Sequence, residues 1–497
     1  MTTSIYKLLT ALLLSLTIAG CDGSGEDDEN TDNSGVNLNA THQVLAFNDL
    51  GMHCADLDYS TFVILPPFNV VHSHVIERGS PPRILDDTQV GLSYRAVMDA
   101  SGSINTTSQN QAGAVQKSNF WDINPKTNNS YVFDLFGLNP PADEGLAFGQ
   151  AMPGSLNPYI ANAPQPFNHF DANKQWFAAD GVPILPIDDD GQQNAYPLMR
   201  VSATVTATGQ NVASLDVVLP VASEADCQNC HALGEVAAPF DNPIFIDADN
   251  IHDPNSVLQA AKHNILALHD DEHGTNLLNE KPVLCARCHY SAALDLAGTG
   301  PTVAQKDQPT MSAVMHEHHG KLTDNTGATL FPTNGTLEET CYQCHPGKVT
   351  KCLRGAMGGA GIDCVDCHGS MMAVGRDTRE PWIDEPRCES CHTGDAVNND
   401  GAIRLSQAWS DDIDIATPRV ANNKRFAENK DTLYRNSLGH GGVACEGCHG
   451  STHAIWPNAL PTANDNVAAN QLQGHSGSIS ECSACHTTLP LTLSGPH

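Results

Sequence analysis

Positive charge is scarce in this chain of 497 residues, in which 25 lysines and arginines are outnumbered by 57 aspartates and glutamates. The formal net charge is −32 at pH 7, which excludes nucleic acid as a partner because the chain repels a phosphate backbone. Aromatic residues are also few, at 6%, and apolar residues reach only 40%. Parts of this chain therefore lack the side chains from which a protein usually builds its core.

Long hydrophobic runs are absent beyond the start of the chain. The one such run, Leu8–Ile18, follows a lysine and precedes small residues. It is too short to span a bilayer and predicts a signal peptide over residues 1–20. The segment Leu16–Cys21 resembles a bacterial lipobox, which implies that Cys21 becomes the lipidated first residue; an ordinary secretory signal is the alternative. We expect an exported lipoprotein, anchored to a membrane in the periplasm or on the outer cell surface.

The first half of the mature chain is expected to be rich in strands. Residues 21–40 are acidic, rich in Gly, Ser and Asn, and free of aromatic residues, so they predict a flexible lipidated linker. From residue 41 to residue 223, short apolar runs alternate with Pro, Gly and Asn, which predicts a β-rich, sandwich-like domain. Within it, residues 198–207 and 213–219 predict a hairpin.

Cysteine, in contrast, is abundant and ordered. Fourteen of the 17 cysteines form seven copies of Cys-x-x-Cys-His between residues 227 and 486. In this motif two thioethers anchor a c-type haem, and the histidine is the proximal iron ligand. Neither a zinc site nor a disulfide framework requires a histidine after every second cysteine. The sequence therefore predicts seven covalently bound haems c.

The expected thioether cysteines are Cys227, Cys230, Cys285, Cys288, Cys341, Cys344, Cys364, Cys367, Cys388, Cys391, Cys445, Cys448, Cys482 and Cys485. The expected proximal ligands are His231, His289, His345, His368, His392, His449 and His486. Residues 224–497 should form a mainly helical and irregular multihaem cytochrome c domain with little regular sheet, in which the haems supply the core. Its longest expected helix covers residues 255–269.

The second axial ligand of each iron decides between an electron carrier and a catalyst. Of the 23 histidines, sixteen lie outside the motifs. An iron with two histidine ligands carries electrons, whereas an open iron can bind a substrate. The candidate distal ligands are His269, His316, His319, His440, His453 and His475, with His263, His273 and His53 as further candidates.

Several stretches resemble an uncharacterised family of exported multihaem c-type cytochromes that is common in metal-reducing and other anaerobically respiring bacteria. The stretches are Gly439–Pro457, Leu472–His486, Thr310–His316, Pro282–Pro301, Asn48–Tyr59 and Ile64–Asn69. The resemblance covers most of the mature chain and implies electron transfer in the periplasm or at the cell surface. With the acidic charge, it implies as partners other redox proteins, such as cytochromes and quinol-linked donors, and metal ions or minerals.

Three functions remain open. The first is electron relay through closely packed, mostly bis-histidine haems. The second is a reductase or oxidase of small nitrogen or sulfur compounds with one open haem; no motif has the lysine that the active-site haem of pentahaem nitrite reductases usually carries, and no catalytic residue is assigned. The third is a subunit of a cytochrome filament. We expect an electron carrier rather than an enzyme.

The amino-terminal half poses two further questions. A group of histidines there could form a copper or zinc site or be ordinary core and surface residues; its members are His42, His53, His72 and His74. Cys54 and Cys352 are the two cysteines that belong neither to the seven motifs nor to the lipobox. In an oxidising compartment they could form a disulfide or remain two buried thiols.

Overall fold

The computed structural model describes residues 40–49, 51–58, 60–64, 68–106, 127–129, 159–161, 163–167, 169–295, 300–376, 379, 388, 434–451, 458–460 and 462–491. The predicted signal peptide, Cys21 and nearly all of the predicted linker lie outside these residues.

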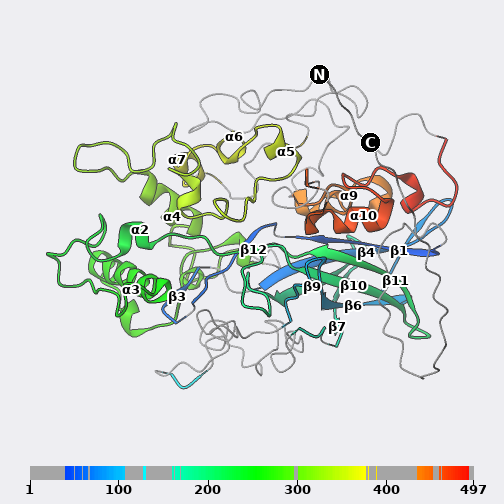
Figure 1. The fold of residues 1–497 in the computed structure, drawn as a ribbon, viewed down its shortest axis with the longest axis horizontal. Coiled ribbons are helices and arrows are strands. Elements are labelled where there is room, and N and C mark those ends of the chain that lie inside the picture. The colour runs from blue at the N-terminus through cyan, green and yellow to red at the C-terminus, as the bar shows by residue number, and fades with distance from the viewer. Residues whose placement is uncertain are drawn as a thin grey trace, which may run out of the picture. The chain divides into compact units, whose positions relative to one another are not determined.

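Two antiparallel sheets make up the amino-terminal half (Figure 1). The first has the order β1-β4-β9-β8, with β5 paired to β4. Its strands are β1 (His42–Asn48), β4 (Phe68–Glu77), β5 (Arg83–Leu85), β8 (His169–Asp171) and β9 (Trp176–Pro183). The second has the order β11-β10-β6-β7, formed by β6 (Val90–Val97), β7 (Gln165–Pro166), β10 (Leu198–Val205) and β11 (Asn211–Val218).

The predicted hairpin is confirmed as β10 and β11, which pair from Leu198 with Val218 onwards. Gly209 lies in the connecting turn with φ of +70°, a conformation that glycine adopts without strain. Strand β6 alternates buried and half-buried residues, as a strand with one face on a core must. One continuous apolar cluster takes residues from both sheets, among them Val75 of the first and Val201 of the second.

Two short parallel pairs connect the amino-terminal segment to the chain just before the first two motifs. Strand β2 (His53–Cys54) pairs with β12 (Val221–Ala222). Strand β3 (Phe62–Val63) pairs with β13 (Val283–Leu284), which directly precedes Cys285. The motif region is therefore fastened to the strand-rich region by backbone hydrogen bonds.

The later half is helical and irregular, as expected. Its helices are α2 (Gln228–His231), α3 (Pro254–His273), α4 (Met311–Gly320), α5 (Ala356–Gly359), α6 (Cys364–His368), α7 (Met371–Val374), α9 (Cys445–His449) and α10 (Val467–Gln473). Single 3-10 turns are η2 (Leu277–Asn279), η3 (Cys285–Arg287), η4 (Ala292–Leu294), η5 (Cys341–Gln343), η8 (Tyr434–Asn436), η9 (His440–Gly442), η10 (Asn464–Asn466) and η11 (Cys482–Ala484).

The last two helices pack on the sheets: α9 contacts β1 and α10 contacts β11 (Figure 1). The side chain of Gln471 in α10 bonds both to the backbone N–H of Asp216 in β11, at 2.8 Å, and to its carboxylate, at 2.9 Å. Among the described helices, none is both long enough and apolar enough to cross a membrane.

Candidate haem sites

A single helical turn shapes the described Cys-x-x-Cys-His motifs. The backbone N–H of the motif histidine donates to the carbonyl of the first cysteine, at 2.9 Å for His231, 3.0 Å for His289 and 2.8 Å for His345. A turn closed in this way places the first cysteine and the histidine on the same side of the helix. The short turn thus presents the thiols and an imidazole together.

Four motif histidines lie opposite a second histidine from elsewhere in the chain. The ring-centre distances are 6.4 Å for His289 and His269, 6.5 Å for His231 and His319, 5.8 Å for His345 and His316, and 6.1 Å for His486 and His440. All four partners were predicted as distal ligands.

This separation is compatible with a metal ion shared by the two rings. Metal–imidazole bonds are about 2 Å long and the ring centre lies about 1 Å beyond the bonded nitrogen, so two imidazoles on opposite sides of one iron have ring centres about 6 Å apart. The porphyrin supplies the other four ligands of a haem iron, so only two protein ligands are needed. The four pairs therefore fit a haem between their rings.

Hydrogen bonds fix the tautomer of three of these histidines. The Nδ1–H of His316 donates to the carbonyl of Ser312 at 2.9 Å, and that of His319 donates to the carbonyl of Met315 at 2.6 Å. The Nδ1–H of His289 donates to the carbonyl of Pro309 at 2.9 Å. Because a carbonyl can only accept, Nδ1 carries the proton and Nε2 keeps its lone pair for a metal.

Burial favours the neutral form of two of the paired imidazoles, His231 and His316. Removal from water, together with the neighbouring imidazoles, lowers the pKa of His231 and of His316 to about 4. The neutral imidazole is the form that binds a metal ion. His231 and His316 are therefore in the ligating protonation state at neutral pH.

Capping residues set the ends of helices α3 and α4, which carry His269, His316 and His319. Helix α3 begins after Asp253, whose side chain accepts from the N–H of Asn255, and it ends at Gly274, with φ of +66°. His269 lies in its last turns, beyond the core-facing part. Helix α4 begins after Thr310, whose hydroxyl accepts from the N–H of Ala313. Such caps set where each helix starts and thus which residues reach the motifs.

Neighbouring motifs touch one another. The thiol of Cys364, in the fourth motif, lies close enough to lower the pKa of Cys341, in the third. The segment before the seventh motif contacts the sixth motif: the backbone N–H of Ile479 donates to the carbonyl of Cys448 at 2.8 Å. The first and third motifs are also in contact. Haems attached to such motifs would lie side by side.

The remaining candidate ligands lie in other surroundings. His263 faces the amine of Lys281 at 3.1 Å, and His273 lies beside His269, with 4.8 Å between their ring centres. His475 lies 3.5 Å from the carboxylate of Glu481. The ring of His53 packs on Phe68, which is 5.2 Å away. His453 and two residues of the fifth motif, Cys391 and His392, lie outside the described residues.

His72 and His74 are buried in β4 around Trp176. The ring of His72 stacks on the indole at 4.2 Å. His74 uses both nitrogens: Nδ1–H donates to the carbonyl of Gln175 at 2.9 Å, and Nε2 accepts from the backbone N–H of Ala444 at 3.0 Å. Across the described residues, no three His, Cys, Asp or Glu side chains gather as a metal site. His74 thus joins β4 to the residue before the sixth motif.

The sixth motif lies over a buried group of charged residues that sequence reasoning missed. Glu446, inside the motif, is 2% exposed. Burial raises the pKa of its carboxyl well above the usual value, nearby Asp49 adds to this, and Arg435 opposes it. Arg435 donates to Asp49 at 2.9 Å, and Asp49 lies 3.9 Å from His72. No local signal predicts this group, since its members come from four separate stretches of the chain.

Cys54 and Cys352 are free thiols in the structure, without the disulfide that was one of the two expectations. Burial, together with the neighbouring Cys352, raises the pKa of Cys54 to about 12. Burial likewise raises the pKa of Cys352 to about 11. The thiol of Cys352 donates to the carbonyl of Pro346 at 2.7 Å.

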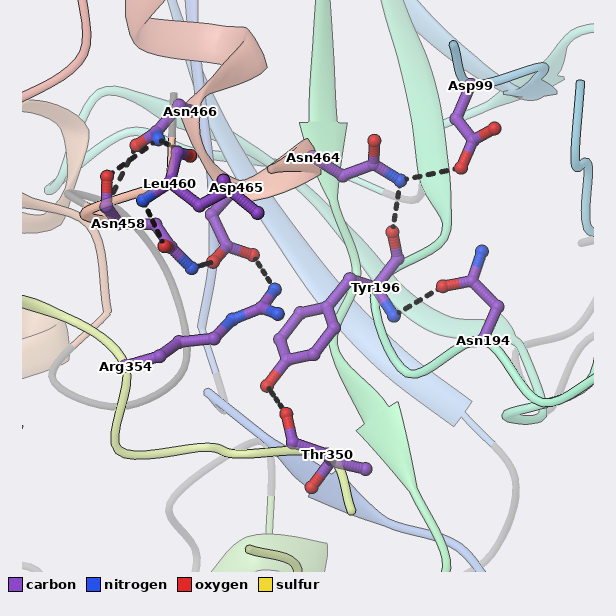
Figure 2. A network of polar contacts seen from close by, with 10 residues as sticks. All are labelled: Asp99, Asn194, Tyr196, Thr350, Arg354, Asn458, Leu460, Asn464, Asp465 and Asn466. Atoms are coloured by element: carbon purple, nitrogen blue, oxygen red, sulfur yellow. Dashed lines mark hydrogen bonds and ion pairs between the residues drawn. The ribbon is translucent and has the colours of Figure 1, made fainter. Parts of the chain in front are cut away.

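A network of polar contacts joins the segment between the third and fourth motifs to the segment before the seventh (Figure 2). Arg354 pairs with the fully buried carboxylate of Asp465, and its guanidinium lies 3.1 Å from the ring centre of Tyr196. The Tyr196 hydroxyl donates to the carbonyl of Thr350 at 2.9 Å, and Asn464 donates to the carbonyl of Tyr196 at 2.9 Å. The network thus fixes two motif-bearing segments on the strand-rich region.

No family model, curated protein or solved structure matches this chain in the comparisons with known proteins.

Proposed function

We propose that this chain is an exported heptahaem c-type cytochrome that relays electrons through closely packed, mostly bis-histidine haems to an acceptor outside the cytoplasm. The observation that carries the proposal is the set of four histidine pairs, each with the ring separation that one iron requires. The seven Cys-x-x-Cys-His motifs supply the attachment sites.

The residues of the chain have distinct tasks in this proposal. A bound haem supplies an iron that accepts and releases one electron. The cysteines of each motif hold the macrocycle, and the motif histidine together with its partner would occupy both axial positions. Acceptors such as the Ser312 and Met315 carbonyls orient the rings, and burial excludes water from His231 and His316. A haem held by two histidines would leave no place on its iron for a substrate, which favours relay over catalysis.

The location and partners belong to the same proposal. Residues 1–20 would direct export, Cys21 would carry the lipid anchor, and residues 224–497 would form the haem domain. The net charge of −32 favours basic patches of other redox proteins, or cationic metal species, as exchange partners.

The test is a haem count and a ligand-binding assay on the exported, purified protein. Pyridine haemochrome analysis should give seven haems per chain, and cyanide, nitrite and hydroxylamine should leave the visible spectrum of the oxidised protein unchanged at the four paired sites. A zinc-containing protein without haem would contradict the proposal. Full haem content with rapid binding of nitrite would instead favour the reductase.

A further inference from the structure

Helix α4 carries two of the paired histidines, three residues apart. His316 faces His345 of the third motif, and His319 faces His231 of the first. Three residues of an α-helix give a rise of about 4.5 Å and a turn of about 300°, so the two side chains leave the helix on adjoining sides. One rigid element thus faces two motif histidines at once.

The two motifs are also joined directly to each other. The backbone N–H of Asp226, next to Cys227, donates to the carbonyl of Gln343 inside the third motif at 3.1 Å. The Asn229 side chain bonds to that of Gln343 at 3.2 Å, and Lys348 pairs with Asp226 at 3.0 Å.

Glu224, just before the first motif, forms a second set of hydrogen bonds with the segment just after the third motif. Its carboxylate accepts from the backbone N–H groups of Gly347 at 2.9 Å, Val349 at 3.2 Å and Thr350 at 2.6 Å. The proximal sides of both sites are therefore fixed to each other, as their distal sides are fixed by α4.

We infer that helix α4 holds the haems of the first and third motifs as one coupled pair, with His319 and His316 as their distal ligands. This inference rests on the proposed function. With an iron beyond each imidazole, the helix geometry puts the two irons about 10 Å apart. Two unit charges at that distance inside a protein change an equilibrium about tenfold. One electron added by an external reductant to either ferric iron therefore makes reduction of the other about tenfold less favourable.

The experiment uses two ligand variants and a control on the same helix. His319→Met and His316→Met each replace one distal ligand by a thioether, which raises the reduction potential of that iron. His318→Met is the control, because His318 is exposed on α4. Each full-length protein is titrated with dithionite while EPR follows each low-spin signal separately.

The coupled pair predicts a reciprocal effect. His319→Met should remove the first-motif signal and also shift the oxidised-to-reduced ratio of the third-motif haem about tenfold at fixed potential. His316→Met should do the converse, and His318→Met should leave both unchanged. If the remaining haem titrates as in the wild type in both variants, the inference is wrong although the relay stands. A wild type without bis-histidine low-spin signals overturns the proposed function itself.

If a variant protein cannot be produced, the coupling of the two haems can still be tested on the wild type. In the fully oxidised protein, two ferric irons about 10 Å apart should shorten each other's spin relaxation, and reduction of one should lengthen it again. Relaxation that is independent of the redox state of the neighbour would overturn the coupling.

Discussion

The ring of His316 lies 5.8 Å from that of His345, and the two planes are only 13° apart. The pairs of His231 with His319 and of His289 with His269 are instead nearly perpendicular, at 77° and 73°. The pair of His486 with His440 is intermediate, at 42°, so the same five-residue motif accepts its partner in more than one orientation. Imidazole orientation splits the iron d orbitals differently, so the pairs should be distinguishable by spectroscopy.

The first prediction concerns the shape of the EPR signals. The parallel pair should give a rhombic low-spin signal, and the two perpendicular pairs should give strongly anisotropic signals with a large maximum g value. His316→Ala should remove a rhombic signal and His269→Ala an anisotropic one. Loss of the same kind of signal in both variants would contradict the ring angles.

His72 and His74 should make the protein sensitive to acid. Burial lowers the pKa of each to about 4. The folded state therefore resists protonation that the unfolded state accepts near pH 6.5. The free energy of unfolding should be undiminished above about pH 6.5 and fall as the pH drops from there to about 4, by on the order of 3 kcal/mol per histidine. Thermal denaturation between pH 4 and pH 8 should show a smaller loss for His72→Gln than for the wild type.

Glu446 has the opposite pH dependence. Its pKa is raised by burial, so the folded state retains a proton that the unfolded state releases above about pH 4.5. Stability from this group is complete below that pH and is lost as the pH rises. Glu446→Gln keeps the shape but cannot ionise, so it should gain stability over the wild type at pH 8 and little at pH 4. Glu481→Gln, on an exposed side chain, is the control. A pH-independent difference would refute the assignment.

The ion pair of Arg354 with Asp465 should contribute more to the free energy of unfolding than the hydrogen bond of Tyr196 to Thr350. Arg354→Ala leaves a fully buried carboxylate without its cation and should cost about 2 kcal/mol of unfolding free energy or more. Tyr196→Phe removes only the bond to Thr350 and should cost about 1 kcal/mol. Chemical denaturation measures both. The double variant of Arg354→Ala with Asp465→Asn should recover part of the loss, and a further loss would contradict the pairing.

Cys54 and Cys352 should react as two slow thiols. Their raised pKa values leave little thiolate at neutral pH, and the thiolate is the reactive form. Native protein should take up iodoacetamide slowly, and protein unfolded without reductant should take up two equivalents per chain at these positions. Mass spectrometry of the peptides locates the label. A disulfide between them would appear as two unlabelled residues that become reactive only after reduction.

Local patterns predicted the elements that local forces determine. Alternation and a turn glycine predicted β10 and β11, and the periodicity over residues 255–269 predicted α3, which continues to His273 because the stop signal is Gly274.

Contacts between residues far apart in the chain could not be predicted from the sequence. The bond between His74 and Ala444 spans 370 positions, and nothing near either residue indicates the other. The candidates His269, His316, His319 and His440 were chosen for their place in the haem half, but their individual partners depend on how α3, α4 and η9 pack. The buried group around Glu446 was missed for the same reason.

The most direct test of the central claim is the spin state of each iron after removal of one partner histidine at a time. Low-temperature EPR of His269→Ala, His316→Ala, His319→Ala and His440→Ala, integrated against the haem content, should show one low-spin iron lost and one high-spin iron gained in each variant. His318→Ala should match the wild type. Variants whose irons all stay low-spin would contradict the assignment of these histidines as distal ligands.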